Sequence, residues 1–413
     1  MNLAWISVGA LVLAVALSCT TTINVGVLSM AMALIVGVFL GGMTPNAVLE
    51  GFPTELLVTL IGVTLLFSIA ECNGTLARLT GRATRLCRGH AGVLPIMFFA
   101  IGFVVATIGA GATPASALLA PPAMAVAARA RVSPLLMAIM TGNGALAGTL
   151  SPFAPTGIVA NGVMERIGLG GVEWHTFAYN ALAHTIVGFG GFLLFGGWKL
   201  FIHRDGTVQA EDPDAGAMET RHWLTTAGIV ALIGTVAGLG MNVGMMGLII
   251  ATVLVLLRTV DEAKAIQRMP WGVILMVTGV TVLVAMMQET QGLALITSGI
   301  ANVSTPETVE PVVAFGTGLV SVYSSTSGVV LPAFLPMVPS LAEQLGGIDP
   351  LSIAWSIAVS ASLVDLSSLS TVGALYMAGA AEGTDTRKLF NALLIWGLSM
   401  SVVGALLCWI MFG

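Results

Sequence analysis

The sequence predicts an all-α polytopic membrane protein with two inverted-topology repeats, each containing a re-entrant hairpin and a broken transmembrane helix. Three observations predict this fold class. Of the 413 residues, 56% are hydrophobic and 8% are charged, so most of the surface must face hydrocarbon. Short motifs recur in the same order in both halves of the chain. Clusters of Gly, Pro, Ser and Thr interrupt the hydrophobic stretches at corresponding places.

The internal repeat consists of motifs at a nearly constant separation of 218, 217 or 216 residues. Each match alone is weak in a chain with 50 glycines, but several matches in one order indicate a duplication. Duplication is typical of secondary transporters, whose substrate site lies between the copies. The matched motifs are Asn24-Val25-Gly26 with Asn242-Val243-Gly244, Gly62-Val63-Thr64 with Gly279-Val280-Thr281, Pro134-Leu135 with Pro350-Leu351, and Ser151 and Gly157 with Ser367 and Gly373.

Each copy is expected to cross the membrane an odd number of times. A crossing helix needs about 20 apolar residues, and the first copy offers 3–20, 24–41, 57–72, 134–160 and 176–200. The first stretch lacks a basic leading segment, so we expect a crossing rather than a cleaved signal peptide. The second copy offers 223–240, 243–258, 271–288, 352–380 and 389–412. An odd number inverts the second copy, with a two-fold axis in the membrane plane.

Two further hydrophobic blocks, 92–130 and 311–345, are each interrupted in the middle. Each can form two full crossings or a re-entrant hairpin whose tip lies at mid-depth. Both alternatives return the chain to the side from which it came. The number of crossings therefore stays odd in either case.

The basic residues predict the orientation in the cell (inner) plasma membrane, where cytoplasmic loops are rich in Lys and Arg. If the loop with Arg78 and Arg82 is cytoplasmic, all of the 15 Lys and Arg residues except Arg166 lie inside, and both termini lie outside. The polar segment 203–221 then forms a cytoplasmic linker between the first transmembrane repeat, 1–202, and the second, 222–413.

The interrupted helices indicate the candidate site, because a break within lipid survives only where protein, water or solute pairs the freed backbone groups. In the first block, Thr113 and Pro114 have the order of an N-cap and a first-turn proline. The second block has small hydroxyl residues at 324–327. The long helices that follow are interrupted at 151–157 and 365–371. Four half-helix starts would offer positive dipole ends to an anion, and their hydroxyls and carbonyls suit a small hard cation.

These segments supply the candidate ligands. The candidate substrate-binding residues are Thr113, Pro114, Ser116, Ser151, Thr156, Ser325, Thr326, Ser327, Ser370 and Thr371. The candidate cation-binding (metal) residues are Ala110, Gly111, Thr113, Asn143, Ser151, Ser324, Ser325, Asp365, Ser367 and Ser368. For any single Ser or Thr, a hydrogen bond to the preceding helical turn is the competing interpretation.

Asp365 is the only acid that must lie well inside a predicted crossing. An ionisable group there is costly, which favours cation coordination or proton transfer. The alternative is a protonated or paired carboxyl that holds the break in shape, for example by capping the next half-helix. For His184, a structural hydrogen bond is the expected role.

Catalytic motifs are absent from the sequence, which lacks a His-Glu-x-x-His motif, a Gly-x-Ser-x-Gly elbow and a phosphate loop. The four cysteines have neither metal-ligand nor disulfide spacing. We therefore expect neither an enzyme nor a nucleic-acid-binding protein.

The chain resembles the MatC-type dicarboxylate (malonate) carriers of the ion transporter superfamily, which are related to divalent anion/sodium symporters. The motifs that carry the resemblance are Gly51-Phe52-Pro53, Asn73-Gly74-Thr75, Ala120-Pro121, Ser151-Pro152, Ser324-Ser325-Thr326, Val364-Asp365 and Ser370-Thr371. The resemblance implies a homodimer with an elevator-like transport domain, Na+ at each pair of hairpin and broken helix, and a dicarboxylate between them. The divalent-anion symporters have Ser-Asn-Thr at their tips and this chain does not, so H+ is the alternative coupling ion.

Three functions are compatible with these features. The first is cation-coupled symport of a small dicarboxylate, such as malonate or a C4-dicarboxylate. No Lys or Arg falls within the breaks, so amide dipoles, hydroxyls and a co-bound cation would have to hold the anion. The second is the membrane subunit of a TRAP-like uptake system fed by a soluble binding protein. The third is an inorganic ion/proton exchanger that uses Asp365.

Overall fold

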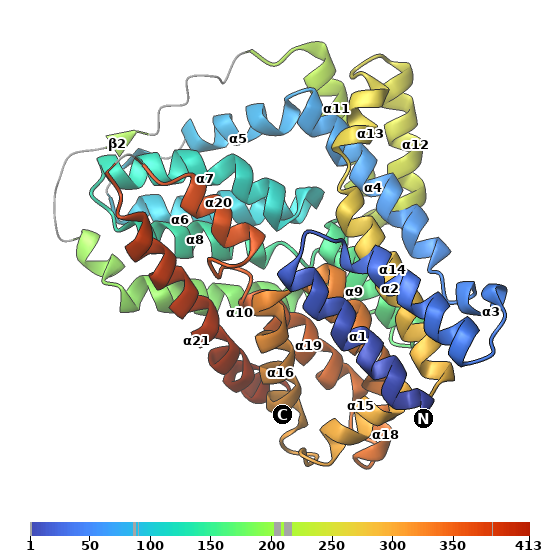
Figure 1. Cartoon of the computed structure of the whole chain (residues 1–413). Helices are drawn as coiled ribbons and strands as arrows, with labels where there is room; N and C mark the ends of the chain where they lie inside the picture. Colours follow the sequence, from blue (N-terminus) through green and yellow to red (C-terminus); the bar gives the residue numbers. More distant parts are fainter. Residues whose placement is uncertain (1, 86–87, 90, 202–207, 210–216, 382) are drawn as a thin grey trace.

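The computed structural model describes residues 2–85, 88–89, 91–201, 208–209, 217–381 and 383–413, and these form an all-α polytopic protein, as predicted (Figure 1). Within them, only β1 (Arg88–Gly89) and β2 (Val208–Gln209) are strands, and they pair antiparallel. Six of the described helices are long and apolar enough to cross a membrane. Most of the predicted linker 203–221 lies outside the described residues.

One side of the molecule contains the helices that precede the hairpin in each half (Figure 1). Their order along the chain repeats, because two crossings are followed by a short connection and a third crossing. The first half contributes α1 (Leu3–Thr20), α2 (Val25–Leu34) with its continuation η1 (Ile35–Leu40), α3 (Pro45–Leu49) and α4 (Thr54–Cys72). The second half contributes α11 (Thr220–Leu239), α12 (Val243–Leu256), α13 (Glu262–Arg268), α14 (Trp271–Glu289) and α15 (Gly292–Ala301).

Two helix pairs join the halves at glycines of the repeated motifs. α2 packs on α14, and α4 packs on α12. A Cβ atom at Gly26 would lie 1.9 Å from the carbonyl oxygen of Leu275, and one at Gly279 would lie 1.9 Å from that of Gly26. A Cβ atom at Gly62 would lie 2.1 Å from the carbonyl oxygen of Gly244. By the repeated motifs, α2 corresponds to α12 and α4 to α14, so the second pair is the first with the two halves exchanged, as a two-fold relation predicts. The inverted orientation of the copies remains a prediction.

The rest of the molecule contains the two hairpins and the two interrupted helices. The first hairpin comprises α6 (Val93–Val105), η2 (Ala106–Ala110) and α7 (Ala112–Arg129), and the second comprises α16 (Val309–Tyr323), η4 (Thr326–Val330), α17 (Leu331–Phe334), η5 (Leu335–Met337) and α18 (Val338–Gln344). The interrupted helices are α8 (Pro134–Ala147) with α9 (Pro155–Arg166), and α19 (Pro350–Leu363) with α20 (Thr371–Ala378).

Packing in this part also repeats between the halves. α6 packs on α8 as α16 packs on α19. α10 (Glu173–Leu194) packs on α8 as α21 (Thr386–Phe412) packs on α19. α7 contacts α20 of the other half, and α17 contacts α9. Each hairpin is therefore held between the interrupted helix of its own half and the segment, α20 or α9, that follows the break in the other half.

Several short helices were not predicted. α3, α13 and α15 have five, seven and ten residues, too few to register as apolar crossings. α5 (Thr75–Arg85) was expected to be a basic loop, because it is too polar to register as a crossing, although its apolar residues recur on one face as in an amphipathic helix. η3 (Gly197–Phe201) follows α10 as a separate 3-10 turn, so the predicted crossing 176–200 ends earlier, at Leu194.

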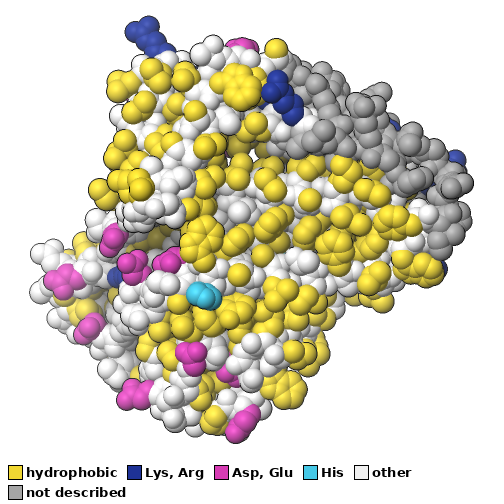
Figure 2. Space-filling model, turned by 180° about the vertical axis from the view of Figure 1, so that it is seen from behind, with side chains coloured by type: hydrophobic (Ala, Val, Ile, Leu, Met, Phe, Trp, Pro, Cys, Tyr) yellow, Lys and Arg dark blue, Asp and Glu magenta, His cyan; other side chains and the backbone are white. Residues whose placement is uncertain are grey.

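Charged side chains are segregated on the surface. Figure 2 shows hydrophobic side chains across the middle of one face, most of its Asp and Glu residues below them, and Lys and Arg residues mainly at the top. An apolar band with Lys and Arg residues gathered on one side of it is typical of a bilayer-spanning protein. The distribution agrees with the predicted multi-pass location in the membrane.

Candidate functional site

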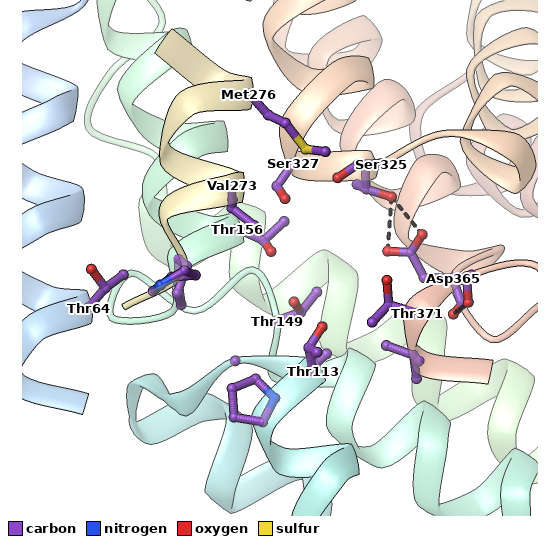
Figure 3. Close-up of a pocket in the computed structure, with 18 of the residues that line it drawn as sticks. Thr64, Thr113, Thr149, Thr156, Val273, Met276, Ser325, Ser327, Asp365 and Thr371 are labelled. Atoms are coloured by element: carbon purple, nitrogen blue, oxygen red, sulfur yellow. Dashed lines mark hydrogen bonds between the residues drawn. The ribbon is translucent and has the colours of Figure 1, made fainter. Parts of the chain in front are cut away.

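A cavity of about 500 Å³ lies where the hairpin tips meet the helix breaks. Its lining comes from both halves of the chain: the tips at 109–114 and 323–327, the starts of α9 and α20, and the facing sides of α4 and α14 (Figure 3). Thr113, Tyr323 and Thr371 are exposed, so the cavity is open to solvent. The predicted convergence of the four interruptions is therefore present.

The first tip turns on two glycines in the left-handed region. Gly109 has φ 121° and Gly111 has φ 79°, and Gly111 is the N-cap of α7. A Cβ atom at Gly109 would lie 2.2 Å from the ring of Phe67, so side-chain volume is excluded there as well. The prediction that Thr113 caps this helix was wrong, because α7 begins at Ala112. Thr113 and Pro114 nevertheless line the cavity from the first turn of α7.

The second tip is organised by its own hydroxyl groups. Ser324 donates to the carbonyl oxygen of Val320 at 2.8 Å. Ser325 is the N-cap of η4, and its Oγ accepts a hydrogen bond from the amide of Gly328 at 3.0 Å. The bond of Ser324 follows the predicted competing interpretation, in which a hydroxyl bonds to the preceding helical turn, whereas Ser325 caps the turn that follows it; both serines also line the cavity.

Thr326 joins this tip to the break between α19 and α20. Its Oγ1 lies 2.8 and 2.9 Å from the two carboxyl oxygens of Asp365, 3.0 Å from the carbonyl oxygen of Ala361, and 2.7 Å from Oγ of Ser321. Figure 3 shows this contact at the edge of the cavity. Four oxygen atoms of three groups thus surround one hydroxyl that has a single proton to donate.

Asp365 does not cap the next half-helix. That role belongs to Ser370, the N-cap of α20, whose Oγ accepts from the amide of Gly373 at 3.2 Å. The carboxyl group of Asp365 is therefore directed at the hairpin tip, and both of its oxygens face Thr326. The predicted capping role is therefore wrong, whereas the carboxyl is paired, as the structural alternative predicts, and cation binding by Asp365 stays a prediction.

The first break is tied to the first hairpin by Ser151. Its Oγ donates to the carbonyl oxygen of Thr107 at 2.7 Å and accepts from the amide of Phe153 at 3.3 Å. Pro155 is the first residue of α9, and Thr156 follows it into the cavity lining. Ser151 is buried behind this surface and does not line the cavity. It supports the break and does not contact the cavity.

Twelve predicted site residues line the cavity and five do not. Those that line it are Ala110, Gly111, Thr113, Pro114, Thr156, Ser324, Ser325, Thr326, Ser327, Asp365, Ser370 and Thr371. Those that do not are Ser116, Asn143, Ser151, Ser367 and Ser368.

Four of the excluded residues have other surroundings. Ser116 is buried 3.5 Å from the hydroxyl of Tyr376. Ser367 accepts from the amide of Leu369, and Ser368 is buried with its Oγ unpaired. Asn143 is not available to a cation, because its Nδ2 donates to a helical carbonyl and its Oδ1 faces His184.

Sequence reasoning missed the lining from the α4 and α14 side. Thr64, Thr149 and Met276 line the cavity, and Thr64 belongs to a repeated motif that could have identified it. It also missed Arg268, which lines the cavity near Glu71, with Nη1 at 3.5 Å from Oε1. The prediction that the breaks contain no Lys or Arg holds, but the guanidinium group of Arg268, at the end of α13, reaches the cavity lining.

The chemistry of the lining is that of a site for hard ions. Hydroxyls, backbone carbonyls and the two carboxyls of Glu71 and Asp365 suit an alkali cation, whereas no group of three or more His, Cys, Asp or Glu residues is found in the described part of the chain. α7, α9 and α20 begin at the cavity, so the positive ends of their helix dipoles point into it.

Comparison with known proteins agrees with the fold. Residues 1–149 match the family described as the N-terminus of the dicarboxylate carrier protein MatC, which confirms the expected resemblance over this part of the chain. The chain is similar in structure to the YdaH transporter of Alcanivorax borkumensis, at 16% sequence identity and a TM-score of 0.62, over 88% of this chain and 86% of that one. At this identity the similarity shows the fold alone. No curated protein is significantly similar in sequence.

Proposed function

We propose that this membrane transporter is a secondary carrier that couples uptake of a small dicarboxylate, such as malonate or a C4-dicarboxylate, to a cation, with Na+ as the first candidate and H+ as the alternative. The observation that carries the proposal is the meeting of both hairpin tips and both helix breaks in one polar cavity, with Asp365 at its edge. The family match of residues 1–149 supports a dicarboxylate as the substrate class.

The cavity suits an anion only if its charge is balanced. Amide dipoles at three helix starts and the hydroxyls of both tips would contact the carboxylates of the substrate. A bare anion in a low-dielectric site is strongly disfavoured unless it is paired. A cation bound between Asp365 and Thr326 of the second hairpin tip would supply the balancing positive charge. Binding of the cation is therefore a requirement for transport, and each ion favours the other.

The packing supports an elevator-type alternating access, and the resemblance to dicarboxylate carriers implies a homodimer. The glycine contacts of α2 with α14 and of α4 with α12 hold backbones so close that little sliding is available. These pairs would form the fixed scaffold, and the hairpins with the interrupted helices would move past them. The cavity extends to Arg268 and Glu71, on the end predicted to be cytoplasmic, so the structure corresponds to an inward-facing state in this proposal.

Uptake into proteoliposomes with separate Na+ and H+ gradients, against a panel of di- and tricarboxylates, tests the function. The expected result is accumulation of one small dicarboxylate that depends on one of the two gradients and is nearly absent without it. Substantial cation-independent uptake from pH 5 to 8 would refute the proposal. Uptake only with an added soluble binding protein would instead indicate a TRAP-like subunit, and inorganic ion exchange without organic substrate would indicate the exchanger.

A further inference from the structure

His184 lies at the centre of a buried polar network outside the cavity, where α10 crosses α8 and α19. Its Nδ1 is 2.9 Å from Oδ1 of Asn143, and its Nε2 is 2.6 Å from Oγ of Ser362. Oγ of Ser362 is in turn 2.7 Å from Oδ1 of Asn180. All four side chains are at most 1% exposed. The three contacts are therefore sealed from bulk water.

The backbone fixes the orientation of both amide side chains. Nδ2 of Asn180 lies 2.9 Å from the carbonyl oxygen of Leu146 and 3.2 Å from that of Ala147. Nδ2 of Asn143 lies 2.9 Å from the carbonyl oxygen of Ile139. Rotating either amide by 180° would bring its oxygen against a carbonyl oxygen. Both Oδ1 atoms therefore face the network, and each can only accept a hydrogen bond.

The network needs one more proton than its neutral side chains supply. Its three contacts require three protons. Ser362 has one hydroxyl proton, which it must donate to Asn180. A neutral imidazole adds one more, whereas an imidazolium adds two, one on each nitrogen. Only a doubly protonated His184 can therefore donate to Asn143 and Ser362 at the same time.

The surrounding backbone favours a positive charge at this point. Asn180 bonds the last carbonyls of α8, which ends at Ala147, and Ser362 is the penultimate residue of α19. Carboxyl-terminal helix ends carry partial negative charge. α6, α8 and α19 carry no ionisable side chain that could supply a counter-charge, so burial opposes the charge that the helix ends favour. The other ionisable side chains of α9, α10, η3 and α21 lie toward the helix ends: Glu165, Arg166, Glu173, His175, Tyr179, Lys199, Arg387, Lys388 and Cys408.

We propose that the His184 network is a proton-binding site, in which the imidazolium links the carboxyl-terminal ends of α8 and α19. Loss of the proton must break one of the three contacts and so loosen α10 from one interrupted helix. Because α8 and α19 precede the two breaks at the cavity, proton occupancy at His184 is coupled to the geometry of the substrate site. This inference rests on the proposed carrier function and adds to it a second site, which binds a proton.

Histidine-selective 15N NMR of the purified protein in lipid nanodiscs tests the site directly. The chain has five histidines, and the signals of His184 are identified as those missing from His184→Gln. In the wild type, we expect both nitrogens of His184 to be protonated at pH 5 and one of them to lose its proton as the pH rises to 8. Since the spectrum needs no transport, it is independent of the failure of the proposed function.

Ser362→Ala provides the matched control. It removes the second acceptor, so a neutral His184 can satisfy Asn143 alone, and the signal of a doubly protonated ring should disappear across this pH range. In proteoliposomes, the same variant should lose most of the ratio of uptake rates between pH 5 and 8. The proposal is overturned if His184 of the wild type keeps a single proton from pH 8 to 5, or if wild type and Ser362→Ala titrate identically.

Discussion

The hydroxyl of Thr326 lies 2.8 and 2.9 Å from the two carboxyl oxygens of Asp365, and this contact joins the second hairpin tip to the break between α19 and α20. The two residues are 39 positions apart in the sequence. Their contact brings the acid in the membrane interior to the cavity edge. A single Asp with several hydroxyls and a carbonyl nearby resembles a cation site more than a catalytic one.

Replacement of Asp365 by Asn should uncouple cation binding from transport. The variant keeps the shape of the side chain and its contact with Thr326 but removes the charge, and charge-assisted hydrogen bonds contribute roughly 1.5–3 kcal/mol. We expect the cation concentration for half-maximal uptake to rise at least about tenfold. Measuring uptake against Na+ concentration at fixed pH gives this value, and an unchanged midpoint would remove Asp365 from the cation site.

Replacement of Thr326 by Val should weaken the same site while preserving the side-chain shape. Loss of one hydroxyl ligand is expected to raise the half-maximal cation concentration about fivefold, since an ordinary hydrogen bond contributes about 1 kcal/mol. Thr326→Ser is the control, because it retains the hydroxyl and should behave like the wild type. If Thr326→Val transports like the wild type while Thr326→Ser is impaired, packing of the methyl group matters and the hydroxyl does not.

Replacement of Gly109 by Ala should abolish transport by deforming the first tip. The position has φ 121°, and an added Cβ atom would lie 2.2 Å from the ring of Phe67. The matched control is Gly168→Ala, where φ is 81° but no atom lies within 4 Å of the added Cβ. Both variants carry backbone strain, but only the first meets a steric clash at the cavity. Uptake rates compared at equal amounts of folded protein distinguish them, and equal loss in both would assign the effect to strain alone.

Replacement of Gly279 by Ala should destabilise the contact between α2 and α14. The new methyl group would lie 1.9 Å from the carbonyl oxygen of Gly26, so the helices must separate. Gly234→Ala in α11 is the control, because nothing lies within 4 Å of its Cβ, and Ala stabilises a helix by about 0.5–1 kcal/mol relative to Gly. Thermal unfolding in detergent should show a lower Tm for the first variant and an equal or higher Tm for the second. A similar Tm for both would mean that the helices separate at little cost.

The sequence predicted the interruptions but not all of their contacts. Gly111, Ser325 and Ser370 fall at breaks because Gly and Ser are the residue types that turns and caps require, and this local signal is readable. Thr113 was misassigned as a cap because two glycines with positive φ set the turn, and their conformation is not encoded by residue type alone. Asn143 was misassigned as a ligand because its partner, His184, is 41 residues away.

Packing between the halves explains what else was missed. Thr64 and Met276 reach the cavity because α4 and α14 are brought there by contacts at Gly26 and Gly62, and Arg268 reaches it because α13 packs on α4; no local pattern reports these contacts. The repeat offsets did contain part of this information, since the motif glycines are the ones that meet. A duplication thus predicts which positions are equivalent, but not which equivalents touch.

Arg268 should accelerate the capture of an anionic substrate at the cavity mouth. It is the only Lys or Arg among the described residues that line the cavity, and its side chain is 67% exposed 3.5 Å from Glu71. An exposed pair of this kind contributes at most about 1 kcal/mol to stability, so Arg268→Gln should leave the Tm almost unchanged. Because Arg268 lies at the end predicted to be cytoplasmic, the substitution should lower the rate of efflux of preloaded substrate, which enters the cavity from that side, at low ionic strength, where long-range attraction is unscreened.

Glu71→Gln gives the opposite test of the same charge. It frees Arg268 from its partner, so the rate of efflux at low salt should rise, and the difference from wild type should shrink as salt increases. Lys264→Gln on α13 is the control, because Lys264 does not line the cavity. Initial rates at several ionic strengths, with the coupling cation held constant, separate the three variants. Equal rates for Arg268→Gln and Lys264→Gln at low salt would mean that the general surface charge, and not the arginine at the mouth, draws the anion in.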